Sequence, residues 1–243
     1  MLKYFKPQLI NSPKIRLGAN SDGGYVMPEL VLDKCVALFT YGVGGDYIYE
    51  DTFVNKYKKP TYMFDHTTGH PAWDREDGLH FITEGLGEGE NCKNVREHYN
   101  HFGIEGDIFL KIDTEGAEYD YFQKVDIDDL ASFVCGLVFE IHWLEDPNNQ
   151  SKVVEIFEKL NKHFILTHTH GNNWGGEFDY EGYKVPRVAE FSFVNKRYVT
   201  ESTPDNQDYP IEGIDYPNNS SIDDCDLHII NYSPYKNAVV GVF

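Results

Sequence analysis

The sequence predicts an α/β protein in which helices cover both faces of an open, mostly parallel sheet. Several apolar segments give way to polar residues or glycine at their C-terminal ends, and helix-like segments separate most of them. These apolar segments are residues 36–45, 61–66, 108–118, 133–143 and 163–174. Strand-helix alternation indicates right-handed crossovers between parallel strands. Ligands bind outside the carboxyl ends of such strands, so we expect an enzyme or a ligand-binding protein.

The other elements follow from local signals. The glycine turn Asp22-Gly23-Gly24 predicts an N-terminal hairpin or flap within residues 14–29, closing over the crevice. Helices are predicted over residues 46–58, 92–103 and 151–164, and a further strand over residues 79–83. The strand at 188–195 follows the preceding one without a helix, so it is expected to be antiparallel.

The length of 243 residues fits a single domain. We expect residues 1–243 to form one unit with a core at about 30–198, an N-terminal flap at 1–29 and a C-terminal loop at 199–243. That loop is rich in Pro, Asn, Asp and Ser, and we interpret it as a lid over the site.

Charge and cysteine usage exclude several classes of protein. Lys and Arg number 21 against 40 Asp and Glu, so a nucleic-acid partner is not expected. The four cysteines lack CxxC spacing, and Cys35 and Cys135 lie in apolar runs, which favours a reduced, cytoplasmic protein. No run of about 18 apolar residues occurs, so membrane insertion is not expected.

A glycine loop and an acidic residue indicate a nucleoside-type cofactor. Gly42, Gly44 and Gly45 follow one strand and precede a helix, which lets a ligand approach the backbone closely. Asp65 ends the next strand, where a carboxylate accepts hydrogen bonds from ribose hydroxyls. Tyr47 stands where a dinucleotide fingerprint requires its third glycine, so a cofactor without a pyrophosphate is favoured.

Three motifs together resemble the FkbM-type branch of class I S-adenosylmethionine-dependent methyltransferases. They are KIDTEGAE (111–118), YGVGGDYIYE (41–50) and RLGANSDGGYVMPE (16–29), and the resemblance covers roughly residues 14–195. It implies a Rossmann-like, seven-stranded sheet with an antiparallel last strand, and S-adenosylmethionine held by the glycine loop and Asp65. We also expect Asp22 and Asp113 to contact the cofactor.

The resemblance also implies an acceptor. Many relatives methylate sugar hydroxyls, and the run HTHGNNW (168–174) is similar to a subgroup of capsular heptose O-methyltransferases. We therefore expect a sugar or nucleotide-sugar substrate for capsule or other surface polysaccharide. The alternatives are an NAD-type oxidoreductase, which Tyr47 disfavours, and a catalytically silent binding module. The oligomeric state stays open, with a homodimer as one alternative.

Methyl transfer to a weakly acidic hydroxyl needs a base or a metal ion. Because imidazole titrates near neutral pH, we predict His168 as the base, with His142 or Asp113 orienting it and Glu115 nearby. A divalent metal on Asp113, His142 and His168 is the alternative, disfavoured because two imidazoles suit Mg²⁺ poorly. Residues predicted to contact the acceptor are His170, Asn172, Asn173, Trp174, Trp143 and Arg187.

Overall fold

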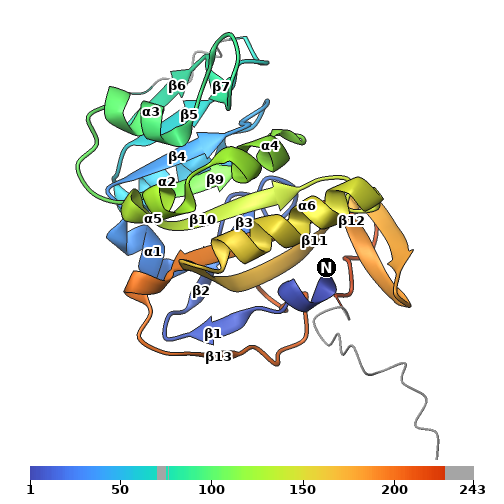
Figure 1. Ribbon diagram of the computed structural model, residues 1–243. Coiled ribbons are helices and arrows are strands. Elements are labelled where there is room, and N and C mark those ends of the chain that lie inside the picture. The colour runs from blue at the N-terminus through green and yellow to red at the C-terminus, as the bar shows by residue number, and fades with distance from the viewer. Residues whose placement is uncertain (70–74, 76, 228–243) are drawn as a thin grey trace, which may run out of the picture.

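The computed structural model describes residues 1–69, 75 and 77–227, and its centre is a seven-stranded sheet (Figure 1). The strand order is β11-β12-β10-β9-β4-β5-β6. The bounds are β4 (Ala37–Tyr41), β5 (Thr61–Phe64), β6 (Leu79–Ile82), β9 (Ile108–Ile112), β10 (Val134–Ile141), β11 (Phe164–Tyr180) and β12 (Tyr183–Asn195). Strands β10, β9, β4, β5 and β6 are parallel, and β12 is antiparallel to both β10 and β11. The predicted fold class is confirmed.

The central strands carry apolar side chains on both faces. Every residue of β4, β9 and β10 is buried, as expected for a parallel sheet covered by helices on each side. Charged side chains within these strands are few, Lys111 in β9 and Glu140 in β10, and both lie near the carboxyl ends of their strands. The first residues after β9 and β10, Asp113 and His142, are therefore well placed for chemistry.

Helices form a layer on each face of the sheet (Figure 1). One face packs against α1 (Glu29–Lys34) and α2 (Ile48–Tyr57), and the other against α3 (Val95–His101), α4 (Ala117–Lys124), α5 (Ile127–Phe133) and α6 (Pro147–Leu160). Helix α6 begins before the predicted residue 151, because Asp146 caps it and Pro147 occupies its first turn. Helices α1, α4 and α5 are additions to the prediction.

The N-terminal region contributes a hairpin, as predicted. Strand β2 (Lys14–Leu17) pairs antiparallel with β3 (Tyr25–Pro28). Before it, the short 3₁₀ helix η1 (Leu2–Tyr4) leads into β1 (Gln8–Ile10), which pairs with β13 (Ser202–Pro204). The remaining short elements are β7 (Gly85–Leu86), β8 (Cys92–Lys93) and η2 (Lys196–Tyr198).

Strands β11 and β12 are longer than predicted. They pair from Phe164 opposite Asn195 to Tyr180 opposite Tyr183, with an irregularity between Asn172 and Glu177. The segment predicted over residues 163–174 therefore does not end there, because the strand continues to Tyr180. The run HTHGNNW lies within β11, and the chain turns only at residues 181–182.

The described part of the C-terminal segment, residues 199–227, is tied to the N-terminal region and β11 by polar contacts, and we call it the strap. Its side chains contribute the pairs Lys14–Asp205 (3.0 Å), His168–Asp215 (2.9 Å), His170–Asp224 (3.1 Å) and Asp22–Asn218 (3.0 Å). The rest of the predicted lid, residues 228–243, lies outside the described residues.

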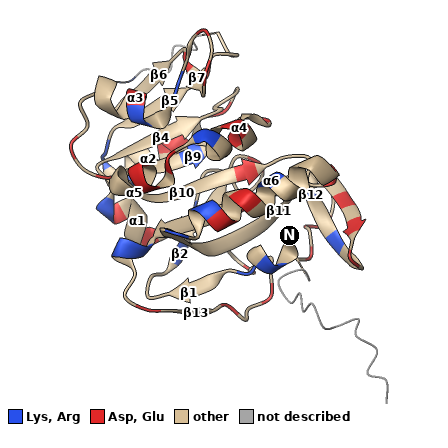
Figure 2. Cartoon of the chain, in the orientation of Figure 1, with Lys and Arg blue, Asp and Glu red and all other residues tan. Residues whose placement is uncertain are grey.

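Acidic residues occur on both helical layers and on the β11–β12 hairpin, with basic residues scattered among them (Figure 2). In the part of the chain that the structure describes, no helix has the length and apolar character needed to span a bilayer.

Candidate active site

A cavity of about 410 Å³ lies at the carboxyl ends of β4, β5 and β9. The residues predicted to bind the cofactor all line it: Asp22, Gly42, Gly44, Gly45, Asp65 and Asp113. The turn after β2 contributes both Asp22 and Gly23, so the N-terminal hairpin borders the same cavity as the glycine loop. None of the described strap residues lines the cavity, so the strap does not act there as the predicted lid.

Two glycines shape the loop after β4 for different reasons. Gly42 has φ +78°, and a Cβ atom there would lie 1.5 Å from the carbonyl oxygen of Asp113, so only glycine fits between the ends of β4 and β9. Gly44 has φ +60°, but no atom lies within 4 Å of the position that a Cβ atom would take there. The loop therefore keeps open space at Gly44, where a ligand approaches the backbone.

Asp65 fixes the glycine loop to the end of β5. Its Oδ2 accepts a hydrogen bond from the Gly44 amide at 2.9 Å, and its Oδ1 accepts from the Thr67 amide at 2.8 Å and hydroxyl at 2.7 Å. Burial acts to raise the pKa of Asp65, but these hydrogen bonds outweigh it and hold the pKa below its ordinary value. Asp65 is therefore an ionised acceptor at the cavity wall.

Lys111 and Glu50 line the cavity, and the sequence analysis did not select them. The Lys111 Nζ atom lies 3.9 Å from Glu50 Oε1 and 4.0 Å from Asp113 Oδ2, too far for a hydrogen bond to either. Glu50 Oε1 is buried, and no hydrogen bond to it is formed within the described part of the chain. Burial raises the pKa of Glu50, and Lys111 partly opposes this. The signal for Lys111 was its place at the start of the KIDTEGAE motif.

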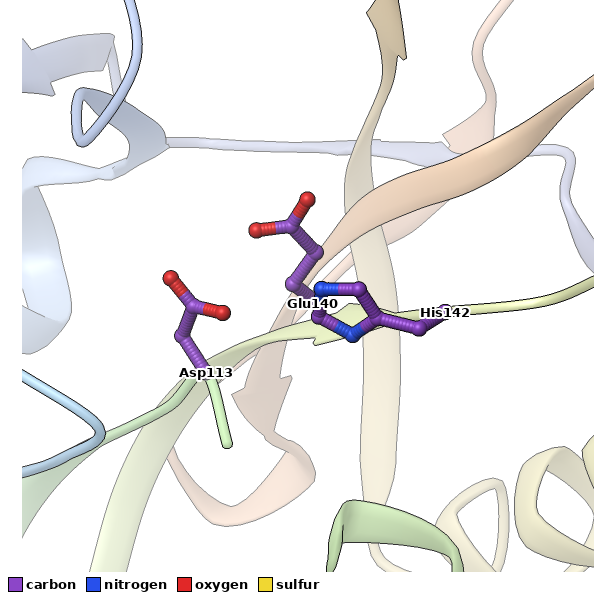
Figure 3. A group of neighbouring side chains, drawn as sticks. All are labelled: Asp113, Glu140 and His142. Atoms are coloured by element: carbon purple, nitrogen blue, oxygen red, sulfur yellow. The ribbon is translucent and has the colours of Figure 1, made fainter. Parts of the chain in front are cut away.

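Three side chains converge where β9 and β10 end (Figure 3). Asp113, Glu140 and His142 each place one potential ligand atom within 4.8 Å of the others. The Tyr25 hydroxyl lies against both carboxylates, donating to Asp113 Oδ2 at 2.7 Å and lying 3.4 Å from Glu140 Oε2. Burial, followed by the charges of Asp113 and Glu190, holds the pKa of Glu140 well above its usual range.

His142 is oriented by a carboxylate that the sequence analysis missed. Glu118 is fully buried, and its Oε1 lies 3.1 Å from His142 Nδ1 and accepts from the His142 amide at 3.4 Å. On the other side of the ring, Nε2 lies 3.3 Å from the exposed Glu115 carboxylate. Burial acts to lower the pKa of His142, but the carboxylates, led by Glu118, outweigh it and raise the pKa. The only sequence signal for Glu118 is its place in KIDTEGAE.

His168 is not positioned as a base for this cavity. It lies within β11, is buried, and pairs through Nε2 with Asp215 of the strap, while none of the described residues forms a hydrogen bond with its Nδ1. Burial lowers its pKa. It lines no part of the cavity and does not belong to the Asp113, Glu140 and His142 group, so the metal set predicted with His168 is also incorrect.

His170 and Asn173 are committed to structural contacts. His170 is 1% exposed and lies between Glu190 and Asp224, at 3.3 and 3.1 Å. Burial acts to lower its pKa, but the carboxylates, Glu190 first, raise it to about 10. Asn173 uses its amide to hold three strap carbonyls and one strap amide. Neither side chain is free to contact an acceptor as predicted.

The other predicted acceptor contacts differ in exposure. Trp143 is 49% exposed and Trp174 is 63% exposed. Asn172 is buried, and its amide donates to Glu140 Oε1 at 2.7 Å, so it supports the strand-end group. Arg187 pairs with Glu145 at 3.1 Å on the β12 side.

Backbone strain is concentrated beside His142. Glu115 and Trp143 have φ values of +50° and +54°, which are uncommon for residues other than glycine. The Trp143 ring packs on Gly116, where a Cβ atom would lie 2.4 Å from the indole. Strained backbone of this kind is often found at functional sites. The exposed indole is thereby fixed beside the strand-end group.

Together these features can bind a nucleoside-containing ligand and remove a proton next to it. A cavity with open backbone at Gly44 and an ionised Asp65 suits the ligand. Beside it, His142 and two carboxylates can accept a proton or hold a cation.

Three solved structures illustrate what the chain is similar to. Fibrillarin from Methanococcus jannaschii aligns with 10% identity over 68% of each chain at a TM-score of 0.41. An rRNA methylase from Streptococcus thermophilus aligns with 10% identity over 68% of this chain and 89% of its own, at 0.40. A putative methyltransferase from Streptococcus mutans, in complex with SAH, aligns with 10% identity over 68% and 90%, at 0.35.

At these scores the structural likenesses carry no argument, and no curated protein matches the sequence. The assignment rests on the sequence family instead. Residues 12–164, more than half of the chain, match the family described as the methyltransferase FkbM domain. The chain belongs to this methyltransferase family.

Proposed function

We propose that the protein transfers the methyl group of S-adenosylmethionine to a hydroxyl group of a sugar. Membership of the FkbM methyltransferase family supports the reaction type. The cavity supports the cofactor, because the residues predicted to hold it from the sequence all line one space. The sugar acceptor is the finer part of the proposal, and it rests on the strand-end group beside that cavity.

In this proposal the cofactor lies along the glycine loop. Asp65 Oδ2 accepts a hydrogen bond from a ribose hydroxyl, because it takes only the Gly44 amide from the chain, whereas Oδ1 takes three bonds. Lys111 and the unpartnered oxygen of Glu50 suit the carboxylate and ammonium of the methionine end. The carboxylates of Asp22, Asp113 and Glu115 at the cavity also favour a cationic sulfonium.

One observation carries the choice of a hydroxyl acceptor. Asp113 lines the cavity, and it belongs to the same group as Glu140 and His142, whose atoms lie within 4.8 Å of one another. A sugar hydroxyl is a weak acid, so methyl transfer to its oxygen requires a group that removes the hydroxyl proton where the oxygen meets the methyl carbon. The sulfonium needs no such help, since it leaves as a neutral thioether.

The acceptor side supports a sugar. The Trp143 indole is exposed and held in place by Gly116, and an aromatic face of this kind packs against the apolar face of a sugar ring. Within this class, our first candidate is a nucleotide-activated heptose for capsule or other surface polysaccharide. The resemblance of HTHGNNW to the heptose subgroup supports that choice. The two histidines of this run are themselves buried in the protein.

The test is a direct assay of methyl transfer. The purified protein is incubated with methyl-labelled S-adenosylmethionine and a panel of free and nucleotide-activated sugars, including heptoses, and the products are identified by mass spectrometry and NMR. We expect one labelled O-methyl sugar, and markedly less of it with Asp65→Asn at a cofactor concentration that saturates only the wild type. Label found only on nitrogen or carbon acceptors would contradict the proposal.

A further inference from the structure

The group at the ends of β9 and β10 has the composition of a metal site (Figure 3). We propose that Asp113, Glu140 and the Nε2 atom of His142 bind a divalent cation of the Mn²⁺ type. The three residues offer two carboxylate oxygens and one imidazole nitrogen within 4.8 Å of one another, close enough for a single ion to contact all three. Cation binding does not depend on the proposed function. The catalytic role that we give the cation below does rest on the proposed function.

Each residue has a ligand atom available. Tyr25 donates to Asp113 Oδ2, and no hydrogen bond to Oδ1 is formed by the described residues. Asn172 donates to Glu140 Oε1, which leaves Oε2 with the long 3.4 Å contact to Tyr25. The outer partners thus hold one oxygen of each carboxylate and leave the other for an ion.

The imidazole is held in the orientation that metal-binding histidines require. Glu118 takes the Nδ1 side of His142, and its other oxygen accepts from the Gly116 amide at 2.8 Å and the Thr114 hydroxyl at 3.0 Å. A buried carboxylate bonded to one ring nitrogen fixes the tautomer, so the lone pair lies on the other nitrogen. The Nε2 contact to Glu115 is made by an exposed side chain that is free to turn away.

The charges near Glu140 also call for a cation. Glu140 is 4% exposed and lies beside Asp113, and among the described residues it forms no ion pair with Lys or Arg. Glu140 is buried and the Asp113 side chain is 22% exposed; a buried carboxylate beside another carboxylate is costly unless it takes up a proton or a positive charge balances it. Lys111 lies 4.0 Å from Asp113, and its charge is shared with Glu50. A divalent ion would balance both carboxylates.

The donor set selects among metals. Carboxylates suit Mg²⁺, Ca²⁺ and Mn²⁺, whereas imidazole suits the transition metals, so two carboxylates with one imidazole favour Mn²⁺ over Mg²⁺. The sequence-based objection to a metal depended on two imidazoles. Glu140 takes the place of His168 in the group, which removes that objection.

In the reaction, the acceptor hydroxyl would occupy an open position on the ion, which lowers the pKa of that hydroxyl. Its O–H bond breaks, and the proton passes to the exposed Glu115 carboxylate and then to water. The freed electron pair on oxygen forms the bond to the methyl carbon. The bond from that carbon to sulfur breaks, and its electron pair stays on sulfur as the neutral thioether.

The test measures Mn²⁺ binding on the full chain after dialysis against a chelator, using the electron paramagnetic resonance signal of free Mn²⁺ and calorimetry. We expect one saturable site in the wild type. Glu118→Gln should weaken Mn²⁺ binding by about 10- to 100-fold, the usual effect of losing an outer partner, and Glu140→Gln by at least as much. Glu105→Gln removes the same charge at an exposed position before β9, at the other end of that strand from Asp113, and is the matched control, with affinity close to wild type. Thermal unfolding verifies that each variant is folded.

Two outcomes would overturn the cation site: no saturable Mn²⁺ binding by the folded wild type, or equal affinity in Glu140→Gln and wild type. Methyl transfer separates this result from the proposed function. Transfer at full rate in excess chelator would remove the cation from the reaction and leave the sugar methyltransferase intact. Saturable Mn²⁺ binding that Glu140→Gln abolishes, with no sugar methylated under any condition, would keep the site and reject the proposed function.

Discussion

The histidine after β10 and the two histidines within β11 belong to the same sheet, yet their surroundings differ. His142 directly follows β10 and presents Nε2 toward Glu115 and the strand-end carboxylates. His168 and His170 lie inside β11, fully enclosed, and pair with Asp215 and Asp224 of the strap. All three are close to carboxylates, so a carboxylate neighbour does not distinguish them.

The difference lies in where each strand ends. A side chain just beyond a parallel strand meets the crevice, whereas one within the strand meets whatever covers the sheet. At β11 the cover is the strap, whose aspartates turn two histidines into structural ion-pair partners. The following predictions test this contrast, from the largest expected effect to the smallest.

The largest effect is expected for His142. His142→Ala should lower methyl transfer by a factor of about 10² to 10⁴, the range for groups that take part in proton removal. His168→Ala should keep the folded protein's turnover within a few-fold, because it lines no part of the cavity. Turnover and cofactor affinity are measured for both variants. Loss of turnover in a folded His168→Ala together with full turnover in His142→Ala would reverse the assignment.

His170 should matter most for stability. His170 lies between the carboxylates of Glu190 and Asp224. Replacing it by a neutral side chain removes the positive charge that both carboxylates contact. His170→Gln is therefore expected to lower the free energy of unfolding by about 3 to 5 kcal/mol, as for other broken buried pairs. Urea denaturation measures this. His101→Gln, on the surface of α3, is the control and should change stability little. Equal stability of the two variants would contradict the structural role.

The same histidine predicts a pH dependence. Its pKa in the folded protein is raised to about 10, against about 6.5 in an unfolded chain. A raised pKa means that the folded state binds the proton more tightly, so this stabilisation is complete below about pH 6.5 and declines as the pH rises toward 10. Unfolding free energies measured from pH 6 to 10 should fall more steeply for the wild type than for His170→Gln. Parallel curves would argue against a protonated His170.

A smaller effect is expected at the cofactor wall. Asp65→Asn should weaken S-adenosylmethionine binding by about 1.5 to 3 kcal/mol, the scale of hydrogen bonds to a charged group. Calorimetry measures the affinity, and thermal unfolding verifies that the glycine loop anchor is not essential for the fold. Asp33→Asn, an exposed residue of α1, serves as the matched control. An affinity like that of the control would exclude the ribose role.

The smallest effect concerns the two exposed tryptophans. Trp143→Ala should raise KM for the sugar by up to about tenfold, since an aromatic packing contact contributes about 0.5 to 1.5 kcal/mol. Trp174→Ala is the comparison, and we expect a weaker effect, because Trp143 is the one adjoining His142 and fixed on Gly116. Steady-state kinetics with both variants decide between them. A larger change in Trp174→Ala would indicate that the acceptor binds near Trp174 in β11 and not near Trp143.

Much of the fold could be predicted because its signals are local. The buried strands are short apolar runs, and the absence of a helix before residue 188 correctly predicted the antiparallel β12. Helices α4 and α5 were not predicted, because each has only eight or seven residues. Helix α4 also begins inside KIDTEGAE, which was interpreted only as a motif at the end of a strand. The prediction ended strand β11 too early, because asparagines and glycines like those in this segment are typical of turns. In the structure, pairing with β12 holds these residues in an extended conformation.

The candidate site divides in the same way. Residues at strand ends were found from the sequence: the glycine loop, Asp65, Asp113 and His142. Residues that act through another element were missed, since Glu118 reaches His142 from α4 and Tyr25 reaches Asp113 from the N-terminal hairpin. Those contacts join positions 24 and 88 residues apart, which no local pattern records.

The sequence by itself determined the main strands, helices α2, α3 and α6, the glycine loop and the carboxylates at the strand ends, because hydrophobic period, glycine and chain direction act over a few residues. The tertiary structure alone decided which polar groups are buried together. The strap covers β11 and pairs its histidines, whereas His142, itself only 6% exposed, faces the exposed Glu115 carboxylate and the strand-end group. Burial and partner depend on segments far apart in the chain, and these two properties separate a structural histidine from a reactive one.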